Sequence, residues 1–393
     1  MKNNIPRFYS YSVFVALSFA FVPIFVLFMH SRGLSYAEIG IVQAIYYALF
    51  FVFEVPTGVI ADKLGRKNTL LLGMLLKVIA LVVSLFSYSF LVFVLAEIFF
   101  SLSRSFSSGA DSAFVYDSLA LSQDTSQYLH VEGKIQTVLL MAHVVGGLLG
   151  ALMATVSLEA VYFFAAVMAI LGFFSALRLT EPQVSHHATS SISGYRQHLL
   201  SSLRDVWGNS KMIWLILYST LIFILLRASI ISFFQPLLIS LSFPENTFSL
   251  IDAMLALGAA GFSWYAFRME KHLGIKRILL LLPIFMIVTF VGIALTMSPL
   301  SLAFYLMSAL VWGLHFPVFR NYLNAQIPQN NKRATILSVE SLVSRGGFSI
   351  LLIPLGYSLE FLGVPQTLLF MSGFGILAMI VLLGFRRRAF GED

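Results

Sequence analysis

The sequence predicts an all-α integral membrane protein of about twelve transmembrane helices in two pseudo-symmetric six-helix halves. Three observations predict this fold class. Hydrophobic residues make up 59% of the 393 residues and charged residues only 11%, whereas a soluble domain carries about 25% charged residues. Apolar stretches of about 20 residues, enough to cross a bilayer as a helix, follow one another along the chain. One longer polar stretch, near residues 179–210, separates two groups of six.

The turns between the apolar stretches are too short to hold a separate soluble domain. The first apolar run lacks the short apolar core and cleavage site of a signal peptide, so we expect it to be retained as a helix. In chain order the predicted helices are 9–29, 38–60, 69–88, 90–112, 133–156, 158–178, 212–235, 247–267, 277–297, 300–324, 334–359 and 365–385.

Positive charges concentrate in alternate loops. The loops after even-numbered helices and both tails carry most of the Lys and Arg residues, whereas the other loops carry essentially Arg32 alone. Because cytoplasmic loops are enriched in Lys and Arg, we expect both termini to be cytoplasmic. The same distribution accounts for the net charge of +7 without a nucleic-acid partner. The chain has no cysteine, which excludes disulfides and thiolate metal sites.

The polar stretch between the two groups of helices is predicted to be a cytoplasmic linker. It divides the chain into an N-terminal bundle, 1–180, a linker, 181–210, and a C-terminal bundle, 211–393. Within the linker, Tyr195–Trp207 carries apolar residues on one helical face opposite two arginines, which is typical of an amphipathic helix at a membrane surface. The adjacent His186 and His187 fit a solvated linker better than a metal site.

The segment Gly58–Lys67 is the most informative motif. Between two apolar stretches it combines two glycines, an acid and three bases. Glycine lets a helix end and backbones approach, a carboxylate accepts a charge-assisted hydrogen bond from an arginine, and the bases favour the cytoplasmic side. The motif residues are Gly58, Asp62, Lys63, Gly65, Arg66 and Lys67. This pattern resembles the loop between helices 2 and 3 of the major facilitator superfamily, G-x-x-x-D-[RK]-x-G-R-[RK].

A weaker copy of this turn follows the eighth predicted helix, at Glu270–Arg277. Two six-helix halves with repeated loops are what the resemblance implies, and paired halves around a midplane site are a recurring transporter architecture. The resemblance therefore implies a monomeric secondary transporter of the bacterial cytoplasmic membrane. It would move a small solute by alternating access and need no cofactor.

In the superfamily, an acid at the cytoplasmic end of helix 4 commonly pairs with the arginine of the signature loop. The resemblance implies such a latch here, which would hold the outward-facing state and open as the cavity turns inward. A static loop anchor is the alternative. The residues assigned to the latch are Gly58, Asp62, Gly65, Arg66, Asp111 and Asp117.

Ionisable residues fall within the predicted helices, although each unpaired charge at a helix centre costs about 2.5–3.5 kcal/mol. We expect them to face one another, the bundle interior or water. Glu97, Arg104 and Asp111 are spaced seven apart, which predicts one helical face that is either a cavity wall or a salt-bridge ladder. The acids are Glu54, Glu97, Asp111, Asp252 and Glu340, the bases are Lys77, Arg104, Arg227, Arg320 and Arg345, and His143 and His315 lie near mid-span.

By the superfamily's arrangement, helices 1, 4, 7 and 10 line the central cavity, so Arg104, Arg227 and His315 would form a positive core. This favours an anionic group on the substrate, since arginine suits carboxylates and phosphates. Mutual pairing of the acids and bases would instead leave a neutral cavity. The residues assigned to substrate binding or coupling are Glu97, Arg104, His143, Arg227, Asp252, His315 and Arg345.

Transport would be secondary, because no phosphate-binding loop for a nucleotide is present. The candidate groups for proton coupling are Glu97, His143, Asp252 and His315, and sodium coupling stays open. Gly146–Ala151 resembles the G-P-x-x-G-G motif of antiporters but lacks its proline and has alanine in place of the last glycine; the resemblance favours export of a drug or metabolite. Glycines also simply pack helices.

Other functions remain as alternatives. Within transport, the alternative is an uptake permease for an anionic molecule such as a carboxylate or an iron chelate (siderophore). An intramembrane enzyme is disfavoured because the sequence has no cysteine and no histidine pair with metal-ligand spacing inside the spans. A channel is disfavoured because no repeated filter-like segment is present.

Overall fold

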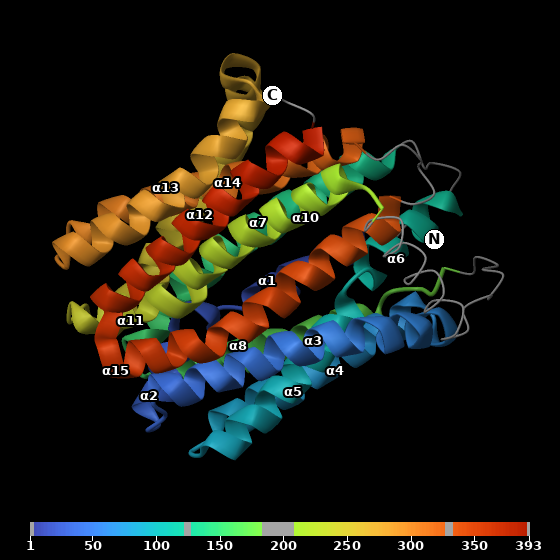
Figure 1. Cartoon of the computed structure of the whole chain (residues 1–393). Helices are drawn as coiled ribbons and strands as arrows, with labels where there is room; N and C mark the ends of the chain where they lie inside the picture. The colour runs from blue at the N-terminus through green and yellow to red at the C-terminus, as the bar shows by residue number, and fades with distance from the viewer. Residues whose placement is uncertain (1–3, 122–126, 183–207, 327–332, 391–393) are drawn as a thin grey trace. The chain divides into compact units, whose positions relative to one another are not determined.

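The computed structural model describes residues 4–121, 127–182, 208–326 and 333–390 (Figure 1). Within these ranges the chain forms helices and turns without a strand, and eleven helical stretches are long and apolar enough to cross a membrane. The prediction of an all-α membrane protein is confirmed.

The helices follow the predicted order. In the first part of the chain they are α1 (Asn4–Leu17), η1 (Val22–Ile24), α2 (Phe25–Ser31), α3 (Tyr36–Leu64), α4 (Arg66–Leu85), α5 (Phe90–Ser107), α6 (Ala110–Ala120), α7 (Tyr128–Ala154) and α8 (Leu158–Leu177). In the second part they are α10 (Ser210–Arg227), η3 (Ala228–Phe233), α11 (Phe234–Ser240), α12 (Glu245–Leu273), α13 (Ile275–Thr296), α14 (Ser301–Gln326) and α15 (Arg333–Phe390).

The last element, α15, contains two membrane crossings. Its apolar stretch Val339–Arg386 is 48 residues long, about twice what one crossing needs. Gly363 interrupts it with φ 79° and ψ 179°, a backbone conformation outside the helical region. The interruption falls between the predicted helices 334–359 and 365–385. The eleven stretches therefore agree with about twelve crossings.

The first crossing of each part is interrupted, where the sequence predicted continuous helices. In the first, residues 18–21 form a turn before η1, and Phe19 N–H bonds the Ala16 carbonyl, one residue tighter than an α-helix allows. Pro23 in η1 has no N–H to continue the ladder. In the second, the π-helix η3 separates α10 from α11. The first interruption begins at Ser18, directly after α1, and the second begins at Ala228, directly after α10.

The signature turn is shorter than predicted. Helix α3 continues to Leu64 and α4 begins at Arg66, so Gly65 alone makes the turn, with φ 85°. Gly274 makes the equivalent turn before α13, with φ 76°. Both conformations suit glycine because a Cβ atom is disfavoured there. The expectation that Gly58 shapes the turn or a backbone contact is wrong: Gly58 lies inside α3, where an added Cβ would meet nothing within 4 Å.

The fourth crossing is also interrupted. Ser108 is extended and Gly109 adopts φ 80°, so α5 ends and α6 begins anew at Ala110. The predicted helix 90–112 is therefore two helices. The prediction that Asp111 shares a helical face with Glu97 and Arg104 is wrong. Asp111 lies in a second helix that begins after the left-handed Gly109, so a spacing of seven residues no longer places it on the same face.

Contacts divide the described chain into two compact units. The first unit contains residues up to Leu34, Ile45 to the end of α8, and Pro244–Ala253, and the second contains Ser35–Ala44, α10 to Phe243, and Met254 onwards. The predicted boundaries at residues 180 and 211 stay a prediction. The predicted amphipathic helix Tyr195–Trp207 and the pair His186 and His187 lie outside the described residues.

Each unit has its own apolar core. In the first unit α4 packs against α5 and α8, and the rings of Phe28 and Tyr162 lie tilted against each other with centroids 4.1 Å apart. In the second unit α15 packs against α10 and α13, and Phe233 meets the edge of Phe290 at 5.5 Å. These cores fix the helices that carry the ionisable side chains.

Candidate functional site

The signature turn forms a charged cluster in the first unit. Arg66 Nε lies 3.5 Å from Asp117 Oδ2, and both side chains are mostly buried. Of the two acids predicted as partners, Asp117 is thus the one brought to Arg66, whereas an Asp111 oxygen accepts the N–H of Ser112 at 2.8 Å. The side chain of Asp62 lies outside the described part. The role of the cluster as a latch stays a prediction.

Glu181 completes this cluster, and sequence reasoning missed it. Its two carboxylate oxygens accept the backbone N–H groups of Arg66 at 2.6 Å and Lys67 at 2.8 Å. The first N–H groups of a helix lack internal partners and carry partial positive charge, so an acid there stabilises the start of α4. A Cβ on Gly65 would come within 2.7 Å of that carboxylate. The turn therefore needs glycine for both its conformation and its space.

Tyr128 lies near the start of α6, close to Asp111 and Ser112. Tyr128 starts α7, and its ring meets Tyr116 edge-on at 5.5 Å. Burial raises the pKa of Tyr128, and the negative charges of Glu132 and Asp111 add to that effect. A hydrogen bond from the Ser112 side chain works in the opposite direction.

His143 and Asp252 form a pair within the spans of the first unit. His143 Nε2 lies 3.2 Å from Asp252 Oδ2, with 28% and 11% of the side chains exposed. Glycines on α7 permit this approach. A Cβ on Gly147 would lie 3.0 Å from Ala253 Cβ and 3.1 Å from the Ser249 carbonyl. The sequence singled out both members of the pair but did not predict their contact.

The glycines of Gly146–Ala151 are therefore packing residues in the structure. Besides Gly147, Gly150 would place a Cβ 3.2 Å from the Ala20 carbonyl and 3.4 Å from Ser249 Oγ. This is the packing explanation that the sequence left open. The link between this motif and the direction of transport stays a prediction.

Lys77 is a buried base that the predicted site left out. Only 4% of the residue is exposed. Its Nζ lies 3.4 Å from the Val15 carbonyl and 3.1 Å from the centroid of the Phe19 ring. The interruption after α1 leaves the Val15 carbonyl without its usual backbone donor, and the Ser18 hydroxyl donates to it at 2.6 Å. The lysine thus lies against the last turn of α1 and against the turn that follows it.

Arg104 and Arg227 are exposed near the middle of their spans, one in each unit. Within the described part of the chain neither forms an ion pair with a carboxylate. Arg227 lies with its guanidinium carbon 5.5 Å from the Phe223 ring centroid, immediately before η3. Short π-helical insertions are frequent at functional sites. The alternative that these two arginines pair with acids stays a prediction, because the structure shows only that no such pair forms among the described residues.

The remaining predicted residues have separate surroundings. Glu97 is 6% exposed and lies close enough to Tyr162 to interact electrostatically. The His315 ring stacks on Phe319 with centroids 5.4 Å apart, and its Nδ1 is buried without a hydrogen-bond partner among the described residues. Arg345 on α15 is partly buried. Glu97 belongs to the first unit, and His315 and Arg345 belong to the second.

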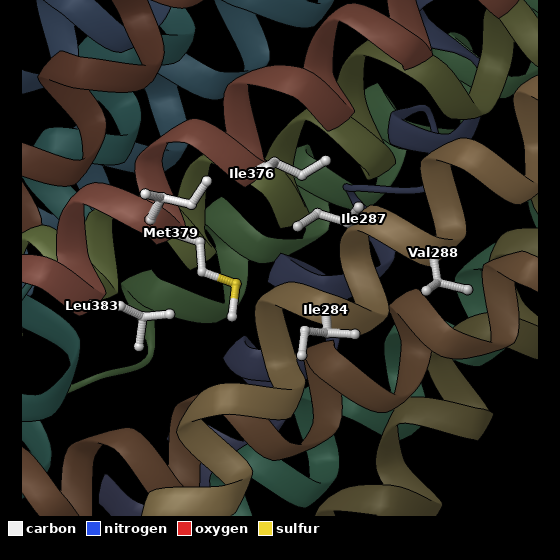
Figure 2. Close-up of a pocket in the computed structure, with 7 residues that line it drawn as sticks. Ile284, Ile287, Val288, Ile376, Met379 and Leu383 are labelled. Atoms are coloured by element: carbon white, nitrogen blue, oxygen red, sulfur yellow. The ribbon is translucent and has the colours of Figure 1, made fainter.

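A groove on the second unit has a different character. It lies between α13 and α15, has a volume of about 280 Å³, and is lined only by aliphatic side chains and one methionine (Figure 2). Binding sites for solutes combine apolar walls with a few placed polar groups. This groove has none, so it is no candidate for solute recognition.

Interrupted membrane spans with ionisable residues inside them are typical of membrane transporters. The Major Facilitator Superfamily profile matches residues 8–351, and the chain belongs to this family. It is a secondary transporter of that type and not an enzyme.

Known proteins agree with this assignment. An uncharacterized MFS-type transporter of Bacillus subtilis (strain 168), YxaM, is 25% identical over 378 residues, 92% of each chain. The nucleoside transporter NupG matches with a TM-score of 0.78 at 16% identity over 98% of this chain and 99% of its own. A D-xylose-proton symporter matches with a TM-score of 0.75 at 12% identity over 97% of each. The two solved structures establish the likeness in fold.

Proposed function

We propose that the protein is a proton-coupled transporter that exports a small organic solute, and that His143 and Asp252 are its coupling pair. The observation that carries this proposal is the 3.2 Å contact between the imidazole and the carboxylate within the membrane spans. Histidine is the side chain whose charge changes near neutral pH. An imidazolium attracts the carboxylate strongly and a neutral imidazole does not, so the strength of this contact depends on one proton.

The surroundings of the pair link that proton to helix packing. Gly147 and Gly150 bring the backbone of α7 against Ser249 and Ala253 on α12. A change in the attraction between His143 and Asp252 therefore acts on two helices that touch directly. Alternating access requires such contacts to differ between states, because a ligand shifts an equilibrium only through unequal interactions with its states. One structural relative is by name a proton symporter, which supports the proton as the coupling ion.

Export is supported by the resemblance of Gly146–Ala151 to the antiporter motif. Uptake of an anionic solute is the second candidate, and a different observation favours it. Arg104 and Arg227 are exposed at mid-span and have no carboxylate partner among the described residues. Guanidinium groups bind carboxylates and phosphates through paired hydrogen bonds. A carboxylate or an iron chelate would supply the missing negative charge.

The charge distribution also supports an orientation. We expect both termini on the cytoplasmic side of the bacterial inner membrane and a monomer as the working unit. Tags at the two ends should be reached by a protease only after the cells are opened.

The first experiment identifies the solute and the direction. Cells lacking and re-expressing the protein are compared by mass spectrometry of the cell contents and of the medium. A compound that builds up inside the deletion strain establishes export. A compound left in the medium establishes uptake.

The second experiment tests the coupling pair with that compound. In proteoliposomes, Asp252→Asn and His143→Gln should abolish accumulation driven by a pH gradient and keep exchange of labelled for unlabelled solute. The matched control is Glu159→Gln, which breaks the ion pair that Glu159 forms with Arg32 at 2.8 Å. Gradient-driven accumulation that survives in both pair variants would refute the assignment.

A further inference from the structure

The aliphatic groove between α13 and α15 is open along one side. Ile284, Ile287 and Val288 line it from α13 (Figure 2). The lining residues on the second crossing of α15 are Ile376, Met379, Ile380 and Leu383. Val288 and Ile380 are exposed, and both helices are membrane spans. From Ile376 to Leu383 the groove extends about 10 Å along the helix, so it can receive a segment of a hydrocarbon chain.

The start of α13 and the end of α15 meet at the same end of this groove, because both are attached to one place on α10. Tyr218 donates its hydroxyl to the Leu279 carbonyl at 2.7 Å. Trp214 donates its indole N–H to the Leu382 carbonyl at 2.7 Å. The two rings stack on each other with centroids 5.2 Å apart. Helix α13 and the second crossing of α15 therefore run antiparallel beside the groove.

Basic residues gather at that end. Arg277 lies seven positions before Ile284, on the same helical face, and Lys276 precedes it; both bases are exposed. On α15, Arg386 comes three positions after Leu383. The bases around the start of α13 and the end of α15 are Arg268, Lys271, Lys276, Arg277, Arg386, Arg387 and Arg388, and the acids are Glu270 and, outside the described residues, Glu392 and Asp393. The bases outnumber the acids, so this end of the groove is positive.

An aliphatic groove that ends in positive charge matches the chemistry of an anionic phospholipid. An acyl chain needs no polar partner along the groove, whereas a solute does. Basic pockets beside membrane spans bind anionic head groups. Lysine offers a phosphate a compact charge, and arginine offers it paired hydrogen bonds. A zwitterionic lipid fits the groove equally well, but its choline group is repelled by the bases.

We propose that the groove and its basic end form a binding site for an anionic phospholipid, with an acyl chain in the groove and the phosphate at Lys276 and Arg277. The site lies on the second unit, whereas His143 and Asp252 belong to the first, so it does not depend on the proposed function. A lipid bound there contacts both α13 and α15. It should stabilise the folded protein, because a ligand that binds only the folded state does so.

The test is native mass spectrometry of the full-length protein in detergent, titrated with phosphatidylglycerol or with phosphatidylcholine of the same acyl chains. One phosphatidylglycerol molecule should stay bound at concentrations at which phosphatidylcholine is lost. Lys276→Gln combined with Arg277→Gln should weaken that binding at least about tenfold, since each base near the membrane surface attracts an anionic lipid. The matched control, Lys134→Gln with Arg178→Gln, removes two exposed bases from the first unit. It should leave the binding unchanged.

A second variant tests the groove without changing any charge. Ile380→Trp fills the groove with an indole ring and should also remove the bound phosphatidylglycerol. Val381→Trp is its control, because Val381 is exposed but points about 100° away from Ile380 around α15. Equal retention of the two lipids would overturn the proposal, since only unselective contact with the protein surface would remain. So would phosphatidylglycerol binding that survives Ile380→Trp, because the bases alone would then account for it.

Discussion

Gly65→Ala should destabilise the protein much more than Gly274→Ala, although both glycines make the same turn. Their backbones are nearly the same, with φ 85° and ψ 161° at Gly65 and φ 76° and ψ 150° at Gly274. Residues other than glycine are strained there by roughly 1–3 kcal/mol. That cost is common to both substitutions, so Gly274→Ala should cost about 1–3 kcal/mol.

The difference between the two sites is Glu181. A Cβ on Gly274 would meet nothing within 4 Å, whereas one on Gly65 would lie 2.7 Å from Glu181 Oε1. The carboxylate would have to move away from the N–H groups of Arg66 and Lys67. Hydrogen bonds to charged groups contribute about 1.5–3 kcal/mol each. Losing one of the two brings the expected cost of Gly65→Ala to about 2.5–6 kcal/mol.

The assay is denaturant unfolding of the purified protein in detergent micelles, followed by tryptophan fluorescence. Gly65→Ala is measured alone and combined with Glu181→Ala. Because the obstacle is then absent, the cost of Gly65→Ala in the Glu181→Ala background should fall to that of Gly274→Ala. Equal costs for the two glycines in the wild-type background would refute the reasoning. So would a cost of Gly65→Ala that does not change when Glu181 is removed.

Three further predictions concern the first unit. Lys77→Met should leave the free energy of unfolding unchanged or raise it by about 1–2 kcal/mol, because replacing a buried charge by an apolar side chain is often stabilising; solute transport should fall. Asp117→Asn should lower the unfolding free energy by about 1–2 kcal/mol through its contact with Arg66. Gly147→Leu should separate α7 from α12, so that Ser249→Cys, buried in the native protein, reacts faster with a maleimide.

The first of these predictions has an outcome that would contradict it, and the other two have matched controls. If Lys77→Met lowers the free energy of unfolding, the lysine stabilises the interruption after α1 and its role is structural. Asp111→Asn should cost less than Asp117→Asn, and the reverse order would remove Asp117 from the cluster at Arg66. Gly133→Leu lies on the same helix in open space and should leave the maleimide rate unchanged. The chain has no native cysteine, so the labelling reports the introduced thiol alone.

The fold was predictable because the membrane imposes length and polarity on every crossing. Even α15 was correctly separated into two helices from its hydropathy, at a position next to Gly363. The interruptions in the first crossing of each part were not predicted, because hydropathy continues through residues 18–24 and 228–233. Pro23 was a signal of the first interruption in the sequence, whereas the second is distinguished only by the backbone hydrogen bonds of its π-helix. The extent of the signature turn was overestimated, because the polar residues of Gly58–Leu64 continue α3 instead of ending it.

The candidate site was predictable as a set of residue types and not as a set of contacts. Hydropathy marks ionisable residues inside spans, and it correctly marked His143 and Asp252. Hydropathy does not indicate which residues are in contact. His143 and Asp252 are 109 positions apart in the sequence, and only tertiary packing brings them together. Glu181 carried one local signal, an acid just after the sixth crossing. The sequence does not show which helix start accepts this acid, because the contact between Glu181 and the first N–H groups of α4 is formed by tertiary packing.

The partners of the intramembrane charges separate structural from functional roles more sharply than their positions do. Asp117 has a partner of opposite charge in Arg66, and Asp252 contacts the imidazole of His143, which carries a charge only when protonated. Lys77 and Glu340 are held by uncharged oxygens instead. Arg104 and Arg227 are exposed in mid-span without either kind of partner among the described residues. An arginine in contact with lipid there costs about 2.5–3.5 kcal/mol even on the lowest scale, so we expect each of these two to border water or a polar group.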